Sequence, residues 1–385
     1  MDVEIGRGKK GRRAYGFDDI AIVPSRRTRD AEDVDITWKL GPHTLRIPCL
    51  ASAMDGVVSP SFAVEMGRIG GLAVLNLEGL WARYENAEEQ LDRIASLPKE
   101  TATRTMQEIY LEPLKAELIA RRVKEIKDGG VLAAASLTPQ RVEQFYKVAL
   151  EAGLDVLVIQ GTVVSAEHVS TRVEPLDLKK FIAGCPVPVI VGGVASYATT
   201  LHLMRTGAVG VLVGVGPGHA CTTRGVLGIG VPQATAIADA AAARVQHLLE
   251  TGQYCNVIAD GGMRTGGDVS KAIALGADAV MVGSPLACAA EAPGRGYHWG
   301  MATFHPELPR GTRVKSGTKG TLAEILTGPA HENDGTLNLF GALRTSMATC
   351  GYETLTSFQK AEVMVAPSLM TEGKKLQKEQ DVGMG

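Results

Sequence analysis

Eight short apolar segments recur along the chain, and each of them ends in glycine or polar residues. Their residues are almost continuously apolar, as expected for parallel strands that are buried on both faces. Amphipathic stretches such as 139–153 and 196–208 separate them and show the spacing of helices. The predicted strands are 47–54, 71–76, 129–136, 155–161, 187–193, 208–216, 255–262 and 277–284.

Eight regular strand–helix units predict an α/β fold, a (β/α)8 TIM barrel. Gly153, Gly207 and Gly276 each follow a predicted helix, where a left-handed cap requires glycine. A doubly wound sheet is the rival architecture. The barrel is favoured because the sequence lacks the glycine fingerprint of a dinucleotide-binding sheet.

Two segments interrupt this alternation. Residues 77–128 are rich in charges and helix formers, and they predict a helical insertion after the second strand. Residues 285–340 carry glycine, proline and charge with weak periodicity, and predict a long flap excursion over the surface after the eighth strand. We therefore expect one catalytic barrel over residues 1–371 and a polar, mobile tail over residues 372–385.

Composition narrows the functional classes. The 385 residues are 45 % hydrophobic and 21 % charged, which argues against long disorder. The formal net charge of −2 gives no basic field for nucleic acid, and no apolar run reaches the length of a membrane span. The N-terminus lacks the apolar region of a secretory signal, and the six cysteines form no metal-spaced pair, so a cytoplasmic protein with reduced thiols is expected.

Barrel enzymes carry their chemistry at the C-terminal ends of the strands. The loops after the seventh and eighth predicted strands each open a helix with glycine, at Gly262 and at Gly283–Ser284. Exposed backbone N–H groups in such adjacent loops bind phosphate, although glycines that merely turn the chain are the alternative. Asp260 beside them suits ribose hydroxyls, so the predicted ligand is a nucleotide.

The loop after the sixth strand, GVGPGHACTTRG, is the most specific feature. Gly216 and Gly218 free its backbone, and Cys221 follows them. A cysteine on a strand-end loop is placed as a nucleophile, and backbone dipoles with Arg224 would favour its thiolate. A buried structural cysteine is the alternative, which the flanking hydroxyls and glycines disfavour.

Four motifs together resemble the IMP dehydrogenase/GMP reductase family over nearly the whole barrel. They are YGFDDIAIVP, SAMDGVVSP, GVGPGHACTTRGVLGIGVPQ and ADGGMRTGGDVSKAIALGADAVMVGSPLA. Within the family, the chain is similar to the IMP dehydrogenase-related branch and lacks the paired regulatory cystathionine-β-synthase-type domains.

The resemblance implies that Cys221 attacks C2 of a purine nucleotide, GMP or IMP, and that a nicotinamide cofactor exchanges hydride there. The implied catalytic residues are Cys221 and Thr223, with Glu307 or Glu291 as candidate proton donors near the flap. The implied substrate contacts are Ser52, Met54, Gly218, His219, Asp260, Gly262, Gly283, Ser284 and Met301. The implied cofactor contacts are Gln160, Gly161, Thr162 and Gly193. The carbonyl oxygens of Gly216, Gly218 and Cys221 could hold a monovalent cation such as potassium.

Three departures from the family pattern bear on the reaction. IMP dehydrogenases carry an Arg–Tyr pair on the flap that activates water, but no tyrosine occurs between Met301 and Gly320. Gln160 stands where those enzymes place an aspartate against the cofactor ribose, which removes repulsion of a 2′-phosphate and points to NADP. His219 replaces a phosphate-side serine, and it either adds positive charge toward the phosphate or fills space.

These departures favour a GMP reductase that converts GMP and NADPH into IMP, ammonia and NADP⁺. The runner-up is an IMP dehydrogenase that oxidises IMP to XMP with NAD⁺, with His305, Arg310 or Arg313 replacing the missing base. A non-catalytic purine-nucleotide-binding regulator is a further alternative, which the intact Cys221–Thr223 motif disfavours, as is an unrelated barrel with a structural cysteine. The resemblance also implies a homotetramer, or an octamer of stacked tetramers.

Overall fold

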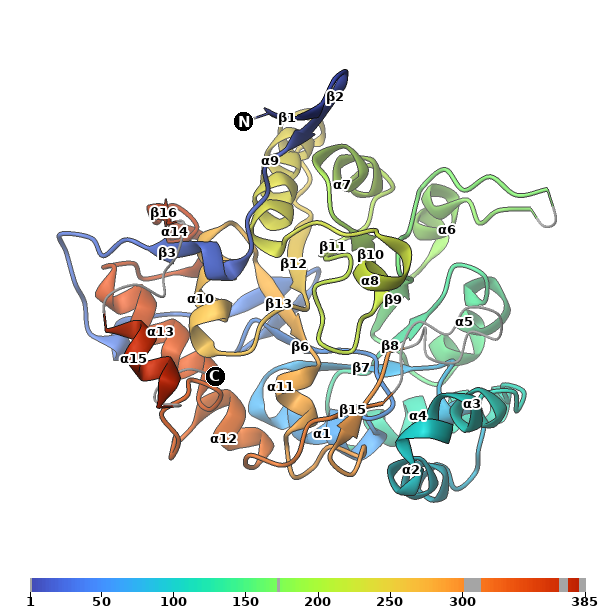
Figure 1. Ribbon diagram of the computed structural model, residues 1–385. Coiled ribbons are helices and arrows are strands. Elements are labelled where there is room, and N and C mark those ends of the chain that lie inside the picture. The colour runs from blue at the N-terminus through green and yellow to red at the C-terminus, as the bar shows by residue number, and fades with distance from the viewer. Residues whose placement is uncertain (1, 172–173, 301–312, 367–372, 381–385) are drawn as a thin grey trace.

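The computed structural model describes residues 2–171, 174–300, 313–366 and 373–380. Eight parallel strands form a closed barrel, which confirms the predicted fold class (Figure 1). Neighbouring strands follow the chain order, and the last pairs with the first through Val280 opposite Cys49. The barrel strands are β6 (Cys49–Ala51), β7 (Leu72–Asn76), β8 (Ala134–Leu137), β9 (Val156–Gln160), β10 (Val189–Val194), β11 (Gly210–Val213), β12 (Asn256–Asp260) and β13 (Ala279–Val282).

A ring of helices covers the barrel, and each barrel strand is followed by one of them. The predicted caps are confirmed, because Gly153, Gly207 and Gly276 have φ of +97°, +93° and +110°. The strands therefore bury one face in the barrel and one under helices, which explains their continuous apolar sequence. The ring is α1 (Pro60–Ile69), α4 (Ala116–Asp128), α5 (Val142–Glu151), α6 (Leu178–Gly184), α7 (Tyr197–Met204), α9 (Gln233–Thr251), α10 (Gly266–Ala274) and α13 (Leu339–Thr349).

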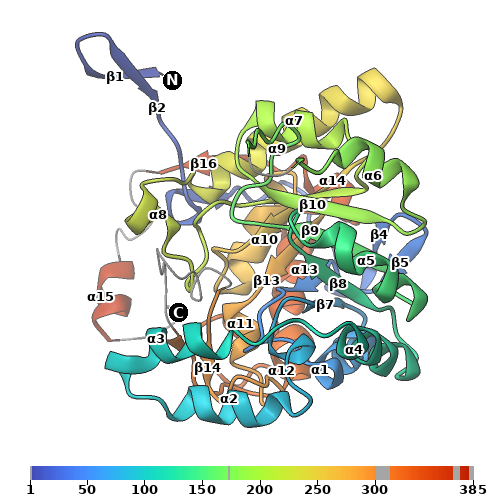
Figure 2. The same ribbon diagram turned by 90° about the vertical axis from the view of Figure 1, so that its right-hand side faces the viewer.

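The helical segment after β7 contains both an insertion and a regular part of the ring. Helices α2 (Ala87–Ser96) and α3 (Lys99–Ile109) stand beside the barrel and pack on each other (Figure 2). Helix α4 instead packs between α1 and α5, so the insertion ends before it rather than at residue 128. An amphipathic pattern shows that a helix buries one face, but it does not show which layer receives that face.

The segment after β13 is partly buried, unlike the predicted surface excursion. It forms α11 (Ser284–Ala287), the hairpin β14 (Tyr297–His298) and β15 (Val314–Lys315), and α12 (Leu322–Thr327). Helix α12 buries Leu322, Ile325 and Leu326 in the main core. These elements are too short to show a clear period in the sequence.

Helix α2 is attached to this segment on both sides of residues 301–312. The Arg295 guanidinium contacts the carboxylates of Glu88 and Asp92 on α2. The Arg313 guanidinium donates to the carbonyl oxygens of Ile94, Ala95 and Leu97 at the C-terminal end of α2, and lies 4.4 Å from the centre of the Tyr297 ring. Cations suit this end of a helix because its last carbonyl groups lack partners within the helix.

Several small elements complete the chain. The hairpin β4 (Trp38–Leu40) and β5 (His43–Leu45) closes the N-terminal end of the barrel, where Trp38 Nε1 donates to Asn256 Oδ1 at 2.9 Å. The hairpin β1 (Asp2–Gly6) and β2 (Lys9–Arg12) projects from the body (Figure 2). The remaining elements are η1 (Phe17–Asp19), β3 (Ile20–Ile22), η2 (Ala31–Asp33), η3 (Leu80–Ala82), α8 (Thr223–Leu227), α14 (Leu355–Phe358), β16 (Val363–Val365) and α15 (Lys374–Glu379), the last within the predicted tail.

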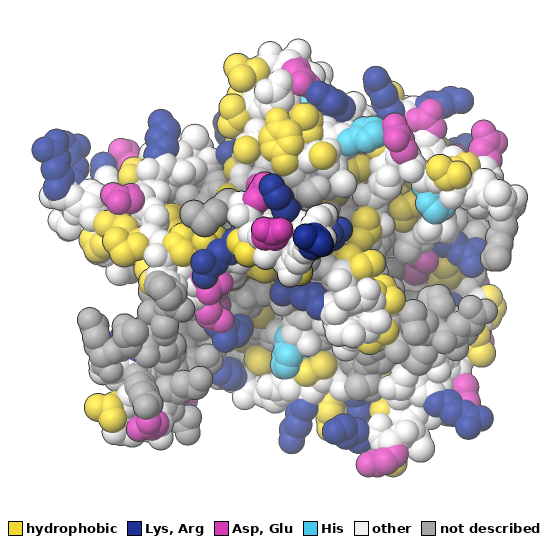
Figure 3. Space-filling view, turned by 45° about the horizontal axis from the view of Figure 1, so that its top comes forward, with side chains coloured by type: hydrophobic (Ala, Val, Ile, Leu, Met, Phe, Trp, Pro, Cys, Tyr) yellow, Lys and Arg dark blue, Asp and Glu magenta, His cyan; other side chains and the backbone are white. Residues whose placement is uncertain are grey.

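The surface shows no concentration of one charge on the face in Figure 3, where basic and acidic side chains are interspersed. Exposed apolar residues Val245, Leu248 and Leu249 lie on α9. Across the described part of the chain, every helix is too short or too polar to cross a membrane.

A buried ion pair joins α9 to the turn before β13. Arg244 Nη1 lies 2.6 Å from Asp278 Oδ2, and both side chains are less than a tenth exposed. The same carboxylate accepts from the Val257 backbone N–H at 2.8 Å and from the Tyr254 hydroxyl at 2.6 Å. The pair thus fixes the outer helix to two neighbouring barrel strands.

Replacing this aspartate, Asp278→Ala, is expected to lower the free energy of unfolding by about 3–5 kcal/mol, because it leaves a buried guanidinium unpaired. Urea denaturation followed by circular dichroism measures the change. The control is Asp128→Ala, which removes the exposed pair with Lys124 and should cost less than about 1 kcal/mol. Equal destabilisation of the two variants would contradict this account of the ion pair.

Candidate active site

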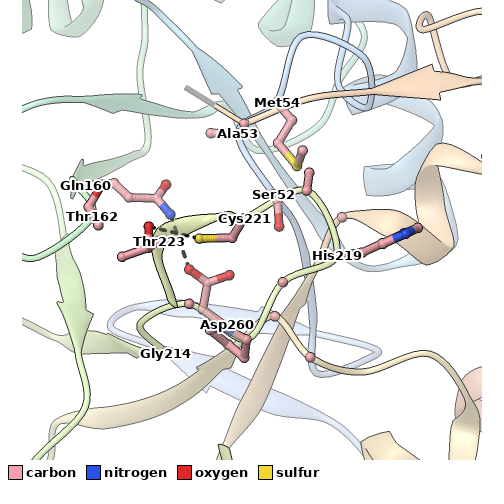
Figure 4. A pocket seen from close by; sticks show the side chains of 18 of the residues that line it. Ser52, Ala53, Met54, Gln160, Thr162, Gly214, His219, Cys221, Thr223 and Asp260 are labelled. Atoms are coloured by element: carbon pink, nitrogen blue, oxygen red, sulfur yellow. Dashed lines mark hydrogen bonds between the residues drawn. The ribbon is translucent and has the colours of Figure 1, made fainter. Parts of the chain in front are cut away.

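A cavity of about 940 Å³ opens at the C-terminal ends of the barrel strands, where the sequence placed the chemistry (Figure 4). Loops after seven of the eight strands contribute to its wall. Of the predicted site residues, the wall includes Ser52, Met54, Gln160, Gly161, Thr162, Gly216, Gly218, His219, Cys221, Thr223, Asp260, Gly262, Gly283 and Ser284.

The loops after β11 and β12 touch through their backbones. A Cβ atom on Gly261 would lie 3.3 Å from the Gly218 backbone, and one on Gly262 would lie 3.0 Å from Pro217 Cβ. Gly261 and Gly262 also have φ of +79° and +83°, which L side chains rarely adopt. Glycine is therefore required at both positions for the two loops to meet.

Cys221 stands on the cavity wall, just before α8 begins. It is exposed, and its Sγ donates to Thr223 Oγ1 at 3.2 Å. Burial raises the thiol pKa of the other cysteines, which are Cys49, Cys185, Cys255, Cys288 and Cys350. Cys221 therefore differs from them in its access to a ligand, as a nucleophile requires.

Asp260 lies at the end of β12 and faces Cys221 across the cavity in Figure 4. Burial raises the pKa of Asp260 to about 7, although a hydrogen bond from Gln160 Nε2 at 3.3 Å lowers it. The Gln160 Oε1 atom is buried without a hydrogen-bond partner among the described residues. The pair thus offers acceptor oxygens that a ligand with hydroxyl or amide donors can satisfy.

Comparison with known proteins decides the family. A sequence model of the IMP dehydrogenase/GMP reductase domain matches residues 14–375. The chain belongs to the IMP dehydrogenase/GMP reductase family. The chemistry of this family is that of oxidoreductases acting on purine nucleotides, and the barrel and its cavity are the expected scaffold for it.

Relatives and a solved structure support this membership. An uncharacterized oxidoreductase of Mycobacterium tuberculosis is 49 % identical over 94 % of this chain and 99 % of its own length. An inosine-5′-monophosphate dehydrogenase of Borreliella burgdorferi is 31 % identical over 81 % of this chain and 80 % of its own length. The crystal structure of an IMP dehydrogenase/GMP reductase-like protein from Corynebacterium glutamicum is 46 % identical, with a TM-score of 0.90 over 94 % of this chain and 97 % of that one.

Some predicted residues lie outside the cavity wall of this family member. Gly193 is buried between strands, and a Cβ atom there would lie 2.7 Å from the Gly214 carbonyl oxygen, so its absence of a side chain serves packing. The Glu291 carboxylate accepts from the Leu322 N–H at 2.8 Å, at the start of α12. Neither residue lines the cavity. The cofactor contact of Gly193 and the proton-donor role of Glu291 stay predictions.

Two arginines with expected chemical roles are held elsewhere. Arg224 Nη2 donates to the Val231 carbonyl oxygen at 2.5 Å, and its stem packs on Gly216 and Gly230. Arg313, a candidate substitute base, holds the end of α2. Met301, His305, Glu307 and Arg310 lie outside the described residues.

The cavity wall also contains residues that the sequence did not single out. Glu78 follows β7, and its carboxylate accepts from the Thr138 N–H at 2.5 Å. Arg264 lies in the loop after β12, where it pairs with Asp18 at 2.9 Å. Their positions at strand ends were the available signal, and only the closed barrel shows that they face the cavity.

Selective alkylation tests the accessibility of Cys221. With iodoacetamide near neutral pH, Cys221 should react faster than any other cysteine, because it is exposed whereas burial raises the thiol pKa of the others and limits the approach of the reagent. Mass spectrometry of tryptic peptides measures each rate. Cys221→Ala should remove the fast site and the control Cys185→Ala should keep it, whereas fast labelling at another cysteine would sink the assignment.

The raised pKa of Asp260 predicts proton release on binding. Ribose hydroxyls that donate to the carboxylate stabilise its charged form, so binding of IMP or GMP at pH 7 should release up to about 0.5 proton from this group. The release should vanish near pH 8.5, where Asp260 is already ionised. Calorimetry in buffers of different ionisation enthalpy measures it. The Asp260→Asn variant measures the protons that the ligand phosphate exchanges on binding, so the difference between the two proteins gives the release from Asp260. Equal release in both proteins would contradict the prediction.

Proposed function

We propose that this protein is a GMP reductase that forms a covalent bond between Cys221 and C2 of the purine. The overall reaction would consume GMP, NADPH and two protons and produce IMP, ammonium and NADP⁺. The observation that carries the proposal is the exposed Cys221 thiol, 3.2 Å from the Thr223 hydroxyl and in one cavity with Asp260 and the glycine loops.

The first half of the reaction needs a nucleophile and a route for one proton. Cys221 Sγ bonds to C2 of GMP, and the bond from C2 to the exocyclic amino group breaks. The thiol proton passes through the Thr223 hydroxyl to the departing amino group, which leaves as ammonia. Thr223 suits this role because its hydroxyl is the hydrogen-bond partner of Sγ.

The second half needs a hydride, which the nicotinamide cofactor supplies when bound. Hydride arrival at C2 breaks the carbon–sulfur bond and releases IMP, and the Cys221 thiolate regains a proton from solvent. The cavity fits such a group, because its wall continues past Gln160 to Thr162 and Thr138. The unpartnered Gln160 Oε1 is placed to accept from a carboxamide or a ribose hydroxyl.

The reductive direction is supported by what hydrolysis would require. An IMP dehydrogenase must activate water against the covalent intermediate, and general-base catalysis contributes typically about 10²–10⁴-fold. Residues 302–319 contain no tyrosine for that purpose. Arg313 donates to the end of α2 instead of facing the cavity. Reductive deamination needs no activated water.

An IMP dehydrogenase is the second candidate, and two observations favour it. The Borreliella relative carries that name. The cavity wall beyond Gln160 contains the Glu78 carboxylate, whereas its described lysine and arginine residues are limited to Arg264 on the β12 side. A carboxylate there would repel a 2′-phosphate, which suits NAD better than NADP.

Assembly and ion binding are further parts of the proposal. A cytoplasmic location and a homotetramer are included because the family resemblance implies them. The apolar residues that α9 exposes, Val245, Leu248 and Leu249, would suit a contact between subunits. A potassium ion would use loop carbonyl groups near Cys221. Gly218 O already accepts from the Cys221 N–H at 3.0 Å, which leaves its second lone pair for an ion.

Absorbance at the reduced-nicotinamide band tests the reaction in both directions. GMP with NADPH should lose absorbance and release ammonia, and Cys221→Ala should lower the rate by at least about 10³-fold because it removes the covalent route. Cys185→Ala is the matched control and should keep full activity. Absorbance growth from IMP with NAD⁺, without GMP turnover, would replace the proposal by the dehydrogenase.

Binding separates an enzyme from a regulator. If neither direction shows turnover while IMP and GMP still bind, and if Cys221→Ala leaves binding and downstream function unchanged, the regulator hypothesis would replace both enzymes. If no purine nucleotide binds, all three fail together.

A further inference from the structure

A buried histidine lies directly behind the glycine loop that follows β13. His298, in β14, is fully buried, and its imidazole ring stands between two serine hydroxyls. Its Nε2 lies 2.8 Å from Ser284 Oγ, and its Nδ1 lies 2.6 Å from Ser316 Oγ. The three residues come from the start of α11, from β14 and from the residue after β15, and only Ser284 lines the cavity.

The histidine ring is neutral at physiological pH. Burial, together with the neighbouring His219 whose ring centre is 5.7 Å away, lowers the pKa of His298 to about 4. A neutral imidazole has one N–H donor and one acceptor nitrogen. The chain from Ser316 through His298 to Ser284 can therefore point its hydrogens in one direction or in the other, but not in both.

The two directions present different faces of Ser284 to the cavity. If Ser284 donates to Nε2, its hydroxyl hydrogen is used inside the protein and only lone pairs face a ligand, which repels an anion. If Nε2–H donates to Ser284 Oγ, the hydroxyl hydrogen is free for the ligand, and Ser316 donates to Nδ1. Hydrogen bonds to charged acceptors are about twice as strong as neutral ones, so an anion selects the second direction.

We propose that His298 is a positioning residue that, with Ser316, presents the Ser284 hydroxyl as a donor to the phosphate group of a bound nucleotide. The inference rests on the proposed function for the nature of the ligand, but it assigns a role to two residues behind the cavity wall. His298 touches no ligand. It decides which hydrogen-bonding group of Ser284 the phosphate meets.

The role matters because the donors expected around the phosphate differ in how firmly they are fixed. Backbone N–H groups at Gly262 and Gly283 are fixed donors, whereas a serine hydroxyl rotates and can donate or accept. His219 reaches this region from the loop after β11, and its side chain points away from Cys221 and Asp260 in Figure 4. His298 thus determines whether the Ser284 hydroxyl donates or accepts a hydrogen bond on its cavity side.

The test compares a phosphorylated probe with its unphosphorylated counterpart. Binding of GMP or guanosine is measured by calorimetry without cofactor in a Cys221→Ala background, which cannot form the covalent adduct. The ligand concentration at half saturation is recorded. His298→Leu should raise this concentration about tenfold or more for GMP and less than about twofold for guanosine, because one hydrogen bond to a charged group is lost. Ser316→Ala should shift the GMP value in the same direction by a smaller factor.

Conservative rescue and a matched control separate positioning from structure. His298→Gln keeps a side-chain donor and acceptor and should restore the GMP value to within about threefold. His247→Leu replaces another buried histidine, on α9 away from the cavity, and should change neither probe. The melting temperature of each variant shows whether it folds.

Each outcome has a definite meaning. Equal weakening of GMP and guanosine in His298→Leu, or no rescue by glutamine, would overturn the positioning role. An unchanged GMP value would do the same. The test is independent of the proposed reaction, because the affinities for GMP and guanosine can be compared without turnover. If GMP does not bind to the Cys221→Ala background, ribose 5-phosphate and ribose replace the two probes and the same split is required.

Discussion

The direct backbone contact between the loops after β11 and β12 is the constraint on which the cavity depends. Pro217–Gly218 rests on Gly261–Gly262, and there is no room for a side chain at the contact. The contact brings Cys221, on one loop, opposite Asp260, at the end of the neighbouring strand. Parallel strands of a barrel end at one rim, so side chains far apart in sequence can meet there.

Burial shifts the pKa values of two groups, Asp260 on the cavity wall and His298 behind it. Removing water disfavours charge, which raises the pKa of Asp260 to about 7 and lowers that of His298 to about 4. Both shifts push the group toward its neutral form, in opposite directions on the pH scale. Asp260 and the unpartnered Gln160 Oε1 leave acceptor oxygens in the cavity that hydroxyl donors of a ligand can satisfy.

The sequence predicts the barrel because a strand buried on both faces has a continuous apolar signature. It predicts Cys221, Asp260 and the glycine loops because strand ends locate chemistry in this fold. It does not predict that α4 belongs to the ring, because amphipathicity leaves the receiving layer open. It does not separate a site role from a structural one for Gly193 and Glu291, since a glycine or a carboxylate near a strand end serves packing or a helix start equally well. The role of His298 depends on three separate segments that only the folded chain brings together.

Helix α2 contributes no side chain to the cavity wall among the described residues, yet it holds the chain through Arg295 and Arg313 on either side of residues 301–312. A change in this helix would therefore affect the neighbourhood of the site without removing a side chain from the described cavity wall. Substitutions that lengthen α2 or change its end would alter where the chain leaves and rejoins the barrel, while Cys221 and Asp260 stay in place. Among the described residues, the insertion thus bears on the cavity through the chain that it holds rather than through a side chain of its own.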